Sequence, residues 1–259
     1  QPPKPFTTSR IQQTASNEFG CSPKETMKIC QKLYEMGKIT YMRTDSETYS
    51  KDFLDSASKY ISGRWGGDYI NENINMLAER SDKKSPKKKS KKKSNNKEQS
   101  PSAQEAHEAI RPTDITCDKL KEDLTPREHK MYRLIWRNTA ESCMAPAKYY
   151  SVTASLSSPH ENSLYKHSEE QVNFPGWKVV GGYEETNVLY SYLQTIKKGS
   201  KLNYCKITSK VTLKELKTHY TEAKLVQLLE KKGIGRPSTF SALIDKIQER
   251  DYVKKEHIK

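Results

Sequence analysis

Residues 39–46 (ITYMRTDS) place a nucleophile and a cation close together. The Tyr41 oxygen can attack a phosphorus atom, and because a phenolate leaves more readily than an alkoxide, the ester that forms can be broken again. Such an attack needs a fixed positive charge beside the phosphate, and Arg43 stands two residues away. The neighbouring residues are β-branched and aromatic, so we expect residues 38–43 to be extended, with Tyr41 and Arg43 on one side. Spacing alone favours a structural aromatic, because the chain holds 15 Tyr.

A second stretch, residues 104–113 (QEAHEAIRPT), carries a histidine and an arginine. His107 could donate a hydrogen bond to a phosphate oxygen or orient Arg43. Arg111 could pair with a phosphate or with Glu108. A histidine beside a glutamate is more often part of a structural hydrogen bond, and no Cys/His spacing nearby suits a zinc ion.

A third stretch, residues 233–239 (GIGRPST), is a glycine-bearing turn that opens a helix. Arg236, Ser238 and Thr239, together with free amides at the start of the helix, would suit a phosphate group. The stretch lacks the spacing of a P-loop, which argues against a nucleoside triphosphate. A plain connection between two helices, with Arg236 in solvent, is the structural alternative.

Composition favours a polyanionic partner. The net charge is +14, and residues 81–100 hold nine Lys against one Asp and one Glu, which gives +7 for this segment. Cations that neutralise phosphates release counterions, so nucleic acid is a natural partner. The five cysteines, odd in number and without a C-x-x-C pair, indicate reduced thiols in an intracellular protein. No stretch approaches the ~18 consecutive apolar residues of a membrane span.

The sequence pattern divides the chain into three parts. Residues 1–146 are mainly helical, with helix starts near Thr7, at Ser22, at Ser50 and at Thr125, and residues 81–102 are expected to be a disordered loop because they contain no large apolar residue. Residues 147–210 are β-rich, with strands expected at 149–156, 172–174, 177–180 and 202–207. Helices return from residue 211, the last one expected over residues 238–249.

Both ends of the chain suggest an internal piece of a longer protein. The sequence begins with Gln-Pro-Pro rather than Met, and it stops directly after a helical pattern. No apolar signal region precedes the first helix.

Together the three stretches resemble the type IA DNA topoisomerases, from about residue 5 to residue 253. The tyrosine segment is more similar to bacterial topoisomerase I than to topoisomerase III, which usually has Pro where Met42 stands. By this resemblance Tyr41 is the nucleophile that becomes linked to a 5′ phosphate, Arg43 stabilises the scissile phosphate and His107 assists. The implied DNA contacts, upstream of the cut for the last three, are at Arg111, Arg236, Ser238 and Thr239.

The resemblance implies an α+β multidomain fragment of a toroidal enzyme. Residues 1–146 would be the helical catalytic-tyrosine domain with a CAP-like helix-turn-helix core, 147–210 part of a β arch or hinge, and 211–259 the start of a helical domain that binds single-stranded DNA. The whole enzyme would be a cytoplasmic monomer that relaxes negatively supercoiled DNA without ATP and without a membrane.

The sequence departs from the family pattern in one respect that concerns the cofactor. The family holds Mg²⁺ in a Toprim domain with an Asp-x-Asp signature, and this chain contains no Asp-x-Asp. The resemblance therefore implies a magnesium site outside this chain, no metal ligands within it, and no relaxation by the chain alone.

Two other classes of protein remain open. A non-enzymatic DNA-binding protein could use the two C-terminal helices as a helix-turn-helix, with the lysine run as a basic tail. A tyrosine recombinase would need Arg and His residues ahead of a late tyrosine, whereas Tyr41 precedes both His107 and Arg111.

Overall fold

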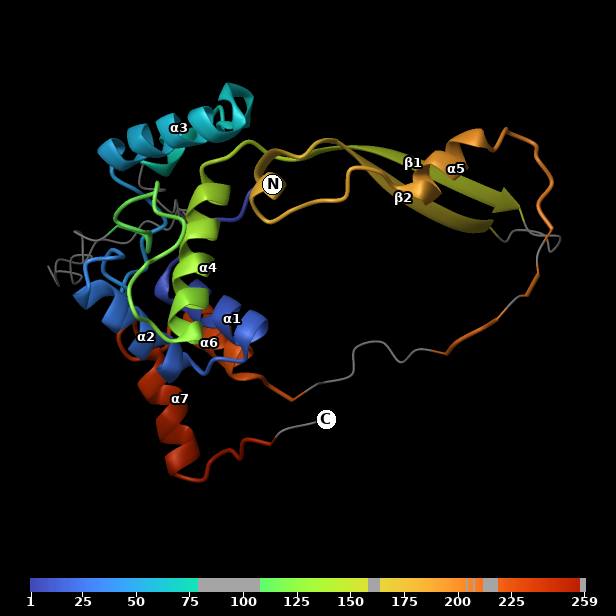
Figure 1. Cartoon of the computed structure of the whole chain (residues 1–259). Coiled ribbons are helices and arrows are strands. Elements are labelled where there is room, and N and C mark those ends of the chain that lie inside the picture. The colour runs from blue at the N-terminus through green and yellow to red at the C-terminus, as the bar shows by residue number, and fades with distance from the viewer. Residues whose placement is uncertain (79–107, 158–163, 204, 207, 212–218, 257–259) are drawn as a thin grey trace, which may run out of the picture.

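The computed structural model has an α+β architecture, as the sequence predicts: a helical body, a two-stranded arm and a second pair of helices (Figure 1). The residues that it describes are 1–78, 108–157, 164–203, 205–206, 208–211 and 219–256. The loop expected at 81–102 and the candidate residue His107 lie outside them.

Four helices form the body: α1 (Thr8–Phe19), α2 (Pro23–Glu35), α3 (Lys51–Trp65) and α4 (Pro126–Ser142), with short 3-10 helices η1 (Gly67–Tyr69) and η2 (Ile74–Leu77) after α3. Three of the predicted starts have hydroxyl caps: Thr7, Ser22 and Thr125 each accept a hydrogen bond from an amide in the first turn. Thr125 and Glu128 complete a reciprocal capping box. Ser50 precedes α3 as predicted, but its side chain makes no capping hydrogen bond.

The body has one continuous hydrophobic core to which all four helices contribute. Its largest fully buried side chains include Ile11 of α1, Leu33 of α2, Ile61 of α3 and Trp136 of α4. The Trp136 indole donates a hydrogen bond of 2.7 Å to the Ile115 carbonyl, so its polar atom is satisfied. Burial of apolar surface at about 25 cal/mol per Å² makes this core the main source of stability for the body.

A long antiparallel pair, β1 (Lys148–Ser157) and β2 (Leu164–Phe174), extends from the body as an arm (Figure 1). β1 confirms the strand predicted at 149–156, and the segment 172–174 is the end of β2. Helix α5 (Val188–Thr195), which the sequence analysis did not predict, packs on both strands.

The two other predicted strands are wrong. Residues 177–180 belong to the 3-10 helix η3 (Gly176–Val180), because the chain turns sharply after β2 to return to the end of α4. Gly176 has φ +50°, and a Cβ there would lie 2.4 Å from the Ala145 oxygen, so the turn requires glycine. In the segment 202–207, the described residues form no strand.

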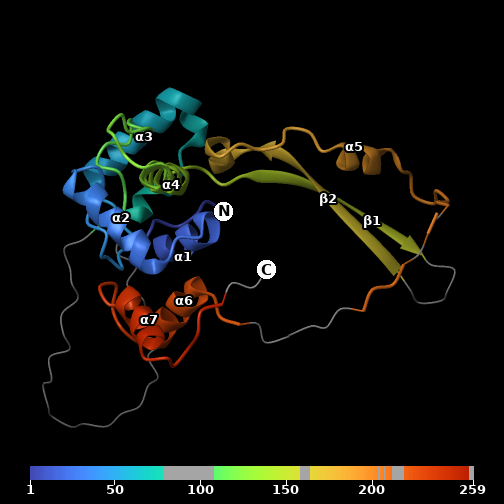
Figure 2. The same cartoon turned by 60° about the horizontal axis from the view of Figure 1, so that its bottom comes forward.

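The last helices are α6 (Glu222–Lys232) and α7 (Phe240–Glu249), and α7 begins two residues later than predicted. They enclose a small core of three buried side chains, Val226, Phe240 and Ile244. α6 packs against α1 and α7 against α2, so the chain follows a ring-like path from body to arm and back to the body (Figures 1 and 2). No described helix is long and apolar enough to cross a membrane.

Candidate active site

Tyr41 lies in the connection between α2 and α3. We call residues 41–47 the tyrosine loop. The extension predicted for 38–43 holds at Ile39, which forms an isolated antiparallel bridge with Pro112, but the backbone bends at Met42 and Arg43. The alternation of a straight strand therefore does not set the directions of Tyr41 and Arg43, and the prediction is wrong on this point. Their directions depend on the contacts that shape the bend.

The two predicted chemical side chains are exposed to different degrees. The Tyr41 ring is half-buried against the body core and meets the Tyr34 ring edge-on, with the ring centroids 5.4 Å apart and the planes at 70°. The Arg43 side chain is exposed, although Met42 and Thr44 on either side of it are buried. A packed aromatic ring beside a solvent-facing cation is an arrangement that can meet a phosphate from outside.

Residues 109–111 hold both ends of the tyrosine loop. Before the loop, the Thr40 hydroxyl donates to the Ala109 carbonyl at 2.9 Å and accepts from the Arg111 amide at 3.0 Å, while the Thr40 amide donates to the Arg111 carbonyl at 2.9 Å. After the loop, the Ala109 amide donates to the Thr48 carbonyl at 2.8 Å. These contacts join positions about 60 to 70 residues apart, so the loop ends are set by the tertiary fold.

The first turn of α1 holds the middle of the loop. The Thr8 hydroxyl lies 2.7 Å from the Met42 carbonyl oxygen, to which it donates, and it accepts from the Thr44 amide at 2.9 Å. The Thr8 amide in turn donates to the Thr44 carbonyl at 2.9 Å. Both peptide groups that flank Arg43 are therefore bonded to one threonine.

Arg111 faces Glu108, the second of the two partners that the sequence allowed. Its Nε and Nη2 donate to the Glu108 carboxylate at 2.6 and 3.1 Å, and its guanidinium carbon lies 4.1 Å from the Phe53 ring centroid. Burial alone would raise the pKa of Glu108, but hydrogen bonds from Arg111 and the Ser50 amide, with the charge of Arg111, bring that pKa below its ordinary value. Arg111 is thus engaged inside the protein, and its contact with DNA stays a prediction.

Arg236, Ser238 and Thr239 lie on the turn between α6 and α7, and all three are exposed. The sequence suggested free amides here, but the Arg236 amide donates to the Thr239 hydroxyl at 2.8 Å and the Thr239 amide donates back to the Arg236 carbonyl at 2.8 Å. Gly235, with φ +82°, allows the turn, because a Cβ there would lie 2.8 Å from a Leu243 methyl carbon. The Thr239 hydroxyl also donates to the Arg236 carbonyl at 3.1 Å, so the exposed side chains of Arg236 and Ser238, rather than the two amides or that hydroxyl, are available to a phosphate.

The two predicted sites are connected through α1. Ser9, which follows Thr8, donates from its hydroxyl to the Glu230 carboxylate of α6 at 2.7 Å. A second polar contact joins Lys24 of α2 to Asp245 of α7 at 3.1 Å. The C-terminal pair is therefore docked on the helix whose first turn holds the tyrosine loop.

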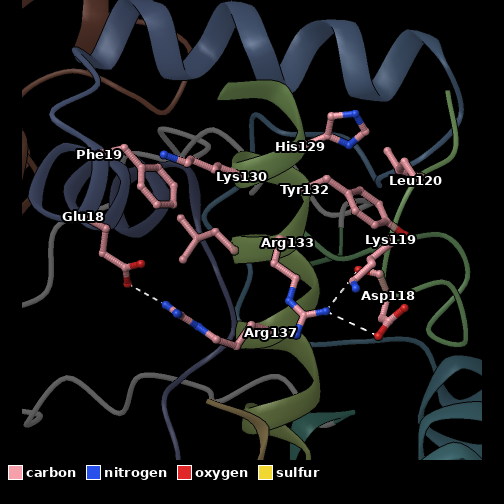
Figure 3. A pocket seen from close by; sticks show the side chains of 11 residues that line it. Glu18, Phe19, Asp118, Lys119, Leu120, His129, Lys130, Tyr132, Arg133 and Arg137 are labelled. Atoms are coloured by element: carbon pink, nitrogen blue, oxygen red, sulfur yellow. Dashed lines mark hydrogen bonds and ion pairs between the residues drawn. The ribbon is translucent and has the colours of Figure 1, made fainter. Parts of the chain in front are cut away.

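A pocket of about 480 Å³ lies elsewhere on the body, between α4, the end of α1 and residues 118–120 (Figure 3). Figure 3 shows Arg133 of α4 reaching Asp118 on one side and Arg137 reaching Glu18 on the other, at 3.4 and 2.6 Å. None of the predicted site residues that the structure describes lines this pocket. It has no part in the tyrosine site.

The described residues do not fit a magnesium ion. Within the described ranges, no group of three or more His, Cys, Asp or Glu side chains is placed to hold a metal. Mg²⁺ prefers several oxygen ligands with near-octahedral geometry.

Comparison with known proteins identifies the family. A family model described as DNA topoisomerase matches residues 1–259. The chain belongs to the type IA DNA topoisomerase family. It is 41% identical over 253 residues to DNA topoisomerase 1 of Buchnera aphidicola and 37% identical over 259 residues to that of Escherichia coli, covering 97% and 99% of this chain.

The structure of a full-length topoisomerase I from Thermotoga maritima is similar in fold to this topoisomerase chain. The TM-score is 0.70 at 27% identity, with 99% of this chain and 39% of that chain covered. This chain spans 27% of the length of each of the two curated relatives above. Membership of the bacterial topoisomerase I group confirms the family that the three sequence stretches indicated.

Sequence reasoning missed the residues that shape the tyrosine loop. Thr8 was interpreted only as part of a helix start, and Thr40 only as a β-branched neighbour of Tyr41. Glu47, whose carboxylate forms salt bridges with Lys4 at 3.3 Å and Arg10 at 2.9 Å, was not predicted to have a role. All three act across 34 or more residues of sequence, so no local pattern could indicate their partners.

Proposed function

We propose that this chain is the part of a longer type IA topoisomerase that supplies the nucleophile for reversible cleavage of one DNA strand. The observation that carries the proposal is the match of the whole chain to the family. It is supported by the position of Tyr41, which lies beside the exposed Arg43 in a loop held by tertiary contacts. The substrate is single-stranded DNA within negatively supercoiled DNA, and the protein acts as a cytoplasmic monomer without ATP.

The proposed reaction is a transesterification. The Tyr41 oxygen attacks phosphorus and loses its proton, the bond between phosphorus and the 3′ oxygen breaks, and the 3′ oxygen leaves as a hydroxyl after gaining a proton. The product is a 5′-phosphotyrosine, and attack by the 3′ hydroxyl reverses each step. One phosphodiester replaces another, so no nucleotide has to be hydrolysed.

The side chains near Tyr41 have distinct roles in this proposal. The Arg43 guanidinium faces the phosphate and stabilises the charge on its oxygens as the bond forms. His107 donates a hydrogen bond at the same phosphate, and Arg236 and Ser238 contact the strand upstream, with Thr239 holding their turn. By the family resemblance, Mg²⁺ would be held by a Toprim domain outside this chain, so we expect the chain alone not to relax DNA.

Replacement of Tyr41 by Phe in the full-length protein tests the proposal. The ring and its contact with Tyr34 remain, and only the attacking oxygen is lost, so the covalent protein–DNA adduct should disappear while oligonucleotide binding and melting temperature stay unchanged. Tyr34→Phe is the matched control, because it removes a hydroxyl from the neighbouring ring and should leave the adduct intact. Recovery of the adduct after denaturation, with peptide mapping, is the measurement. An adduct on another tyrosine would refute the proposal.

The same assay separates the nucleophile from its helpers. Arg43→Ala should slow cleavage by about 10²–10³, the usual loss for one preorganised group that stabilises transition-state charge. His107→Ala should cost the same or less. A residual rate with Arg43→Ala and none with Tyr41→Phe is the expected contrast.

A further inference from the structure

One buried threonine controls the backbone on both sides of Arg43. The Thr8 hydroxyl bonds to the Met42 carbonyl and the Thr44 amide, at 2.7 and 2.9 Å. The Thr8 and Met42 residues are 0% exposed and Thr44 is 3% exposed. Water therefore has no access to replace the hydroxyl, and its loss would leave two buried peptide groups unpaired.

Residues on either side of Thr8 in the sequence also contact Glu47, the last residue of the tyrosine loop. Lys4 and Arg10, which flank Thr8 in sequence, both reach the Glu47 carboxylate, at 3.3 and 2.9 Å. Phe6 forms an isolated β-bridge with Ile110, which belongs to the segment 109–111 that holds the ends of the tyrosine loop. Residues 4–10 thus contact the tyrosine loop at several points, and Thr8 is the member that bonds to the backbone of the bend at Arg43.

We infer that Thr8 is a positioning residue for strand cleavage, acting through the two peptide groups that flank Arg43. The inference rests on the proposed function. Thr8 has no contact with the reacting atoms and sets the distance between the Tyr41 oxygen and the Arg43 guanidinium. A displacement of about 1 Å in such an arrangement costs on the order of 10²-fold in rate.

Thr8→Val in the full-length protein tests the inference, because valine keeps the shape and lacks the hydroxyl. Single-turnover cleavage of an end-labelled oligonucleotide should be on the order of 10- to 100-fold slower. The dissociation constant for the same oligonucleotide should change by less than about threefold, since no group that contacts DNA is altered. Thr8→Ser, which restores the hydroxyl, should recover cleavage to within a few-fold of the unaltered protein.

Thr139→Val controls for a merely structural effect. The Thr139 hydroxyl is also fully buried, but it donates to a carbonyl of its own helix, Ile135 of α4, at 2.8 Å. Its removal should lower the melting temperature without slowing cleavage. If Thr8→Val cleaves as fast as Thr139→Val, Thr8 is structural only and the inference fails.

A second variant covers the case in which Thr8→Val does not fold. Thr8→Cys keeps a small side chain with a weak donor, and its longer sulfur–oxygen contacts would shift the bend, so cleavage should again be slower than with Thr8→Ser. Equal rates for the two variants would overturn the inference. Tyr41→Phe, measured in parallel, distinguishes failure of the inference from failure of the proposed function. A covalent adduct with Tyr41→Phe would contradict the proposed function, whatever the Thr8 variants show.

Discussion

The tyrosine loop and the turn at residues 233–239 are both short and irregular, but they are held in different ways. The hydrogen bonds that shape the loop join Thr8 to Met42 and Thr40 to Ala109, positions 34 and 69 residues apart. The bonds that shape the turn join Arg236 to Thr239, three residues apart. The loop is therefore a product of the whole body, whereas the turn is a product of its own sequence.

This difference matters for what each region can do. A nucleophile gains from a position fixed by many distant contacts, since preorganisation removes the need for rearrangement during reaction. A turn with local contacts keeps its shape when its helices move as a unit. The C-terminal pair has a hydrophobic core of only three buried side chains, and its polar contacts with the body include Ser9–Glu230 and Lys24–Asp245. We expect that pair to leave the body more easily than the body unfolds.

The largest effect should come from matched substitutions in the two cores. Ile135 of α4 and Ile244 of α7 are 0% and 1% exposed. Ile135→Ala should lower the free energy of unfolding of the body by about 2–5 kcal/mol. Ile244→Ala should instead destabilise only the C-terminal pair. Hydrogen–deuterium exchange measures both: the first should accelerate exchange throughout α1 to α4, and the second only in α6 and α7.

The comparison fails if Ile244→Ala accelerates exchange in α4 as much as in α7. The two cores would then unfold together, and the docked pair would be an integral part of the body. Ser9→Ala refines the result, because it removes the contact with Glu230 without opening a cavity in either core.

The part of the fold that follows local rules could be predicted from the sequence. Ser22 and Thr125 begin α2 and α4 because hydroxyl caps and Pro at the first position act within one turn. The strand predicted at 177–180 failed because Gly176, at φ +50°, turns the chain back toward α4, and that tertiary requirement outweighs the β propensity of Trp and Val. The unpredicted α5 owes its place to contact with β1 and β2.

The candidate site likewise contains residues that the sequence predicted and contacts that it could not predict. The residue types of Tyr41 and Arg43 are visible in sequence, and so is the turn that carries Arg236. The bend at Arg43 and the pairing of Arg111 with Glu108 are not visible, because each depends on segments that only the folded body brings together. The roles assigned to these residues stay predictions until the variants are measured.

Tight packing of the body should also appear as a pH dependence at the end of α4. Burial raises the pKa of Glu141 from an ordinary 4.5 to about 7. The positive charge of Arg137 lowers this pKa, and the negative charge of Glu18 raises it. Unfolded, this carboxyl ionises near 4.5, so the free energy of unfolding should fall as pH rises from about 4.5 to about 7 and stay lower above it. Glu141→Gln should remove this fall, giving up to about 3 kcal/mol more stability at pH 8 and little change at pH 4.

Glu128, at the other end of α4, provides a control of opposite sign. Its carboxylate accepts from Lys32 and from the Thr125 amide, and these contacts lower its pKa below 4.5. Its stabilisation is present above pH 4.5 and is lost as pH falls through the lowered pKa. Glu128→Gln should therefore reduce stability at pH 7, and the difference should shrink in acid. Denaturant unfolding measures both variants, in a pH series that runs from 8 to well below 4.5, because the folded Glu128 carboxylate takes up its proton only below that value. Parallel pH profiles for the two would contradict the burial argument.

The smallest effect should be at the turn. Arg236 is exposed, and an exposed ion pair contributes less than about 1 kcal/mol, so Arg236→Ala should weaken binding of mixed-sequence single-stranded DNA by about fivefold or less. A lost phosphate contact should also reduce the slope of log affinity against log salt by about 0.7. Arg250→Ala, which removes an exposed cation from the other end of α7, should leave the slope unchanged. Cleavage by Arg236→Ala at saturating DNA should stay near that of the unaltered protein, because the turn does not shape the tyrosine loop. A slower cleavage rate at saturation would show that the turn and the loop are one site, and that the locally held region contributes to positioning after all.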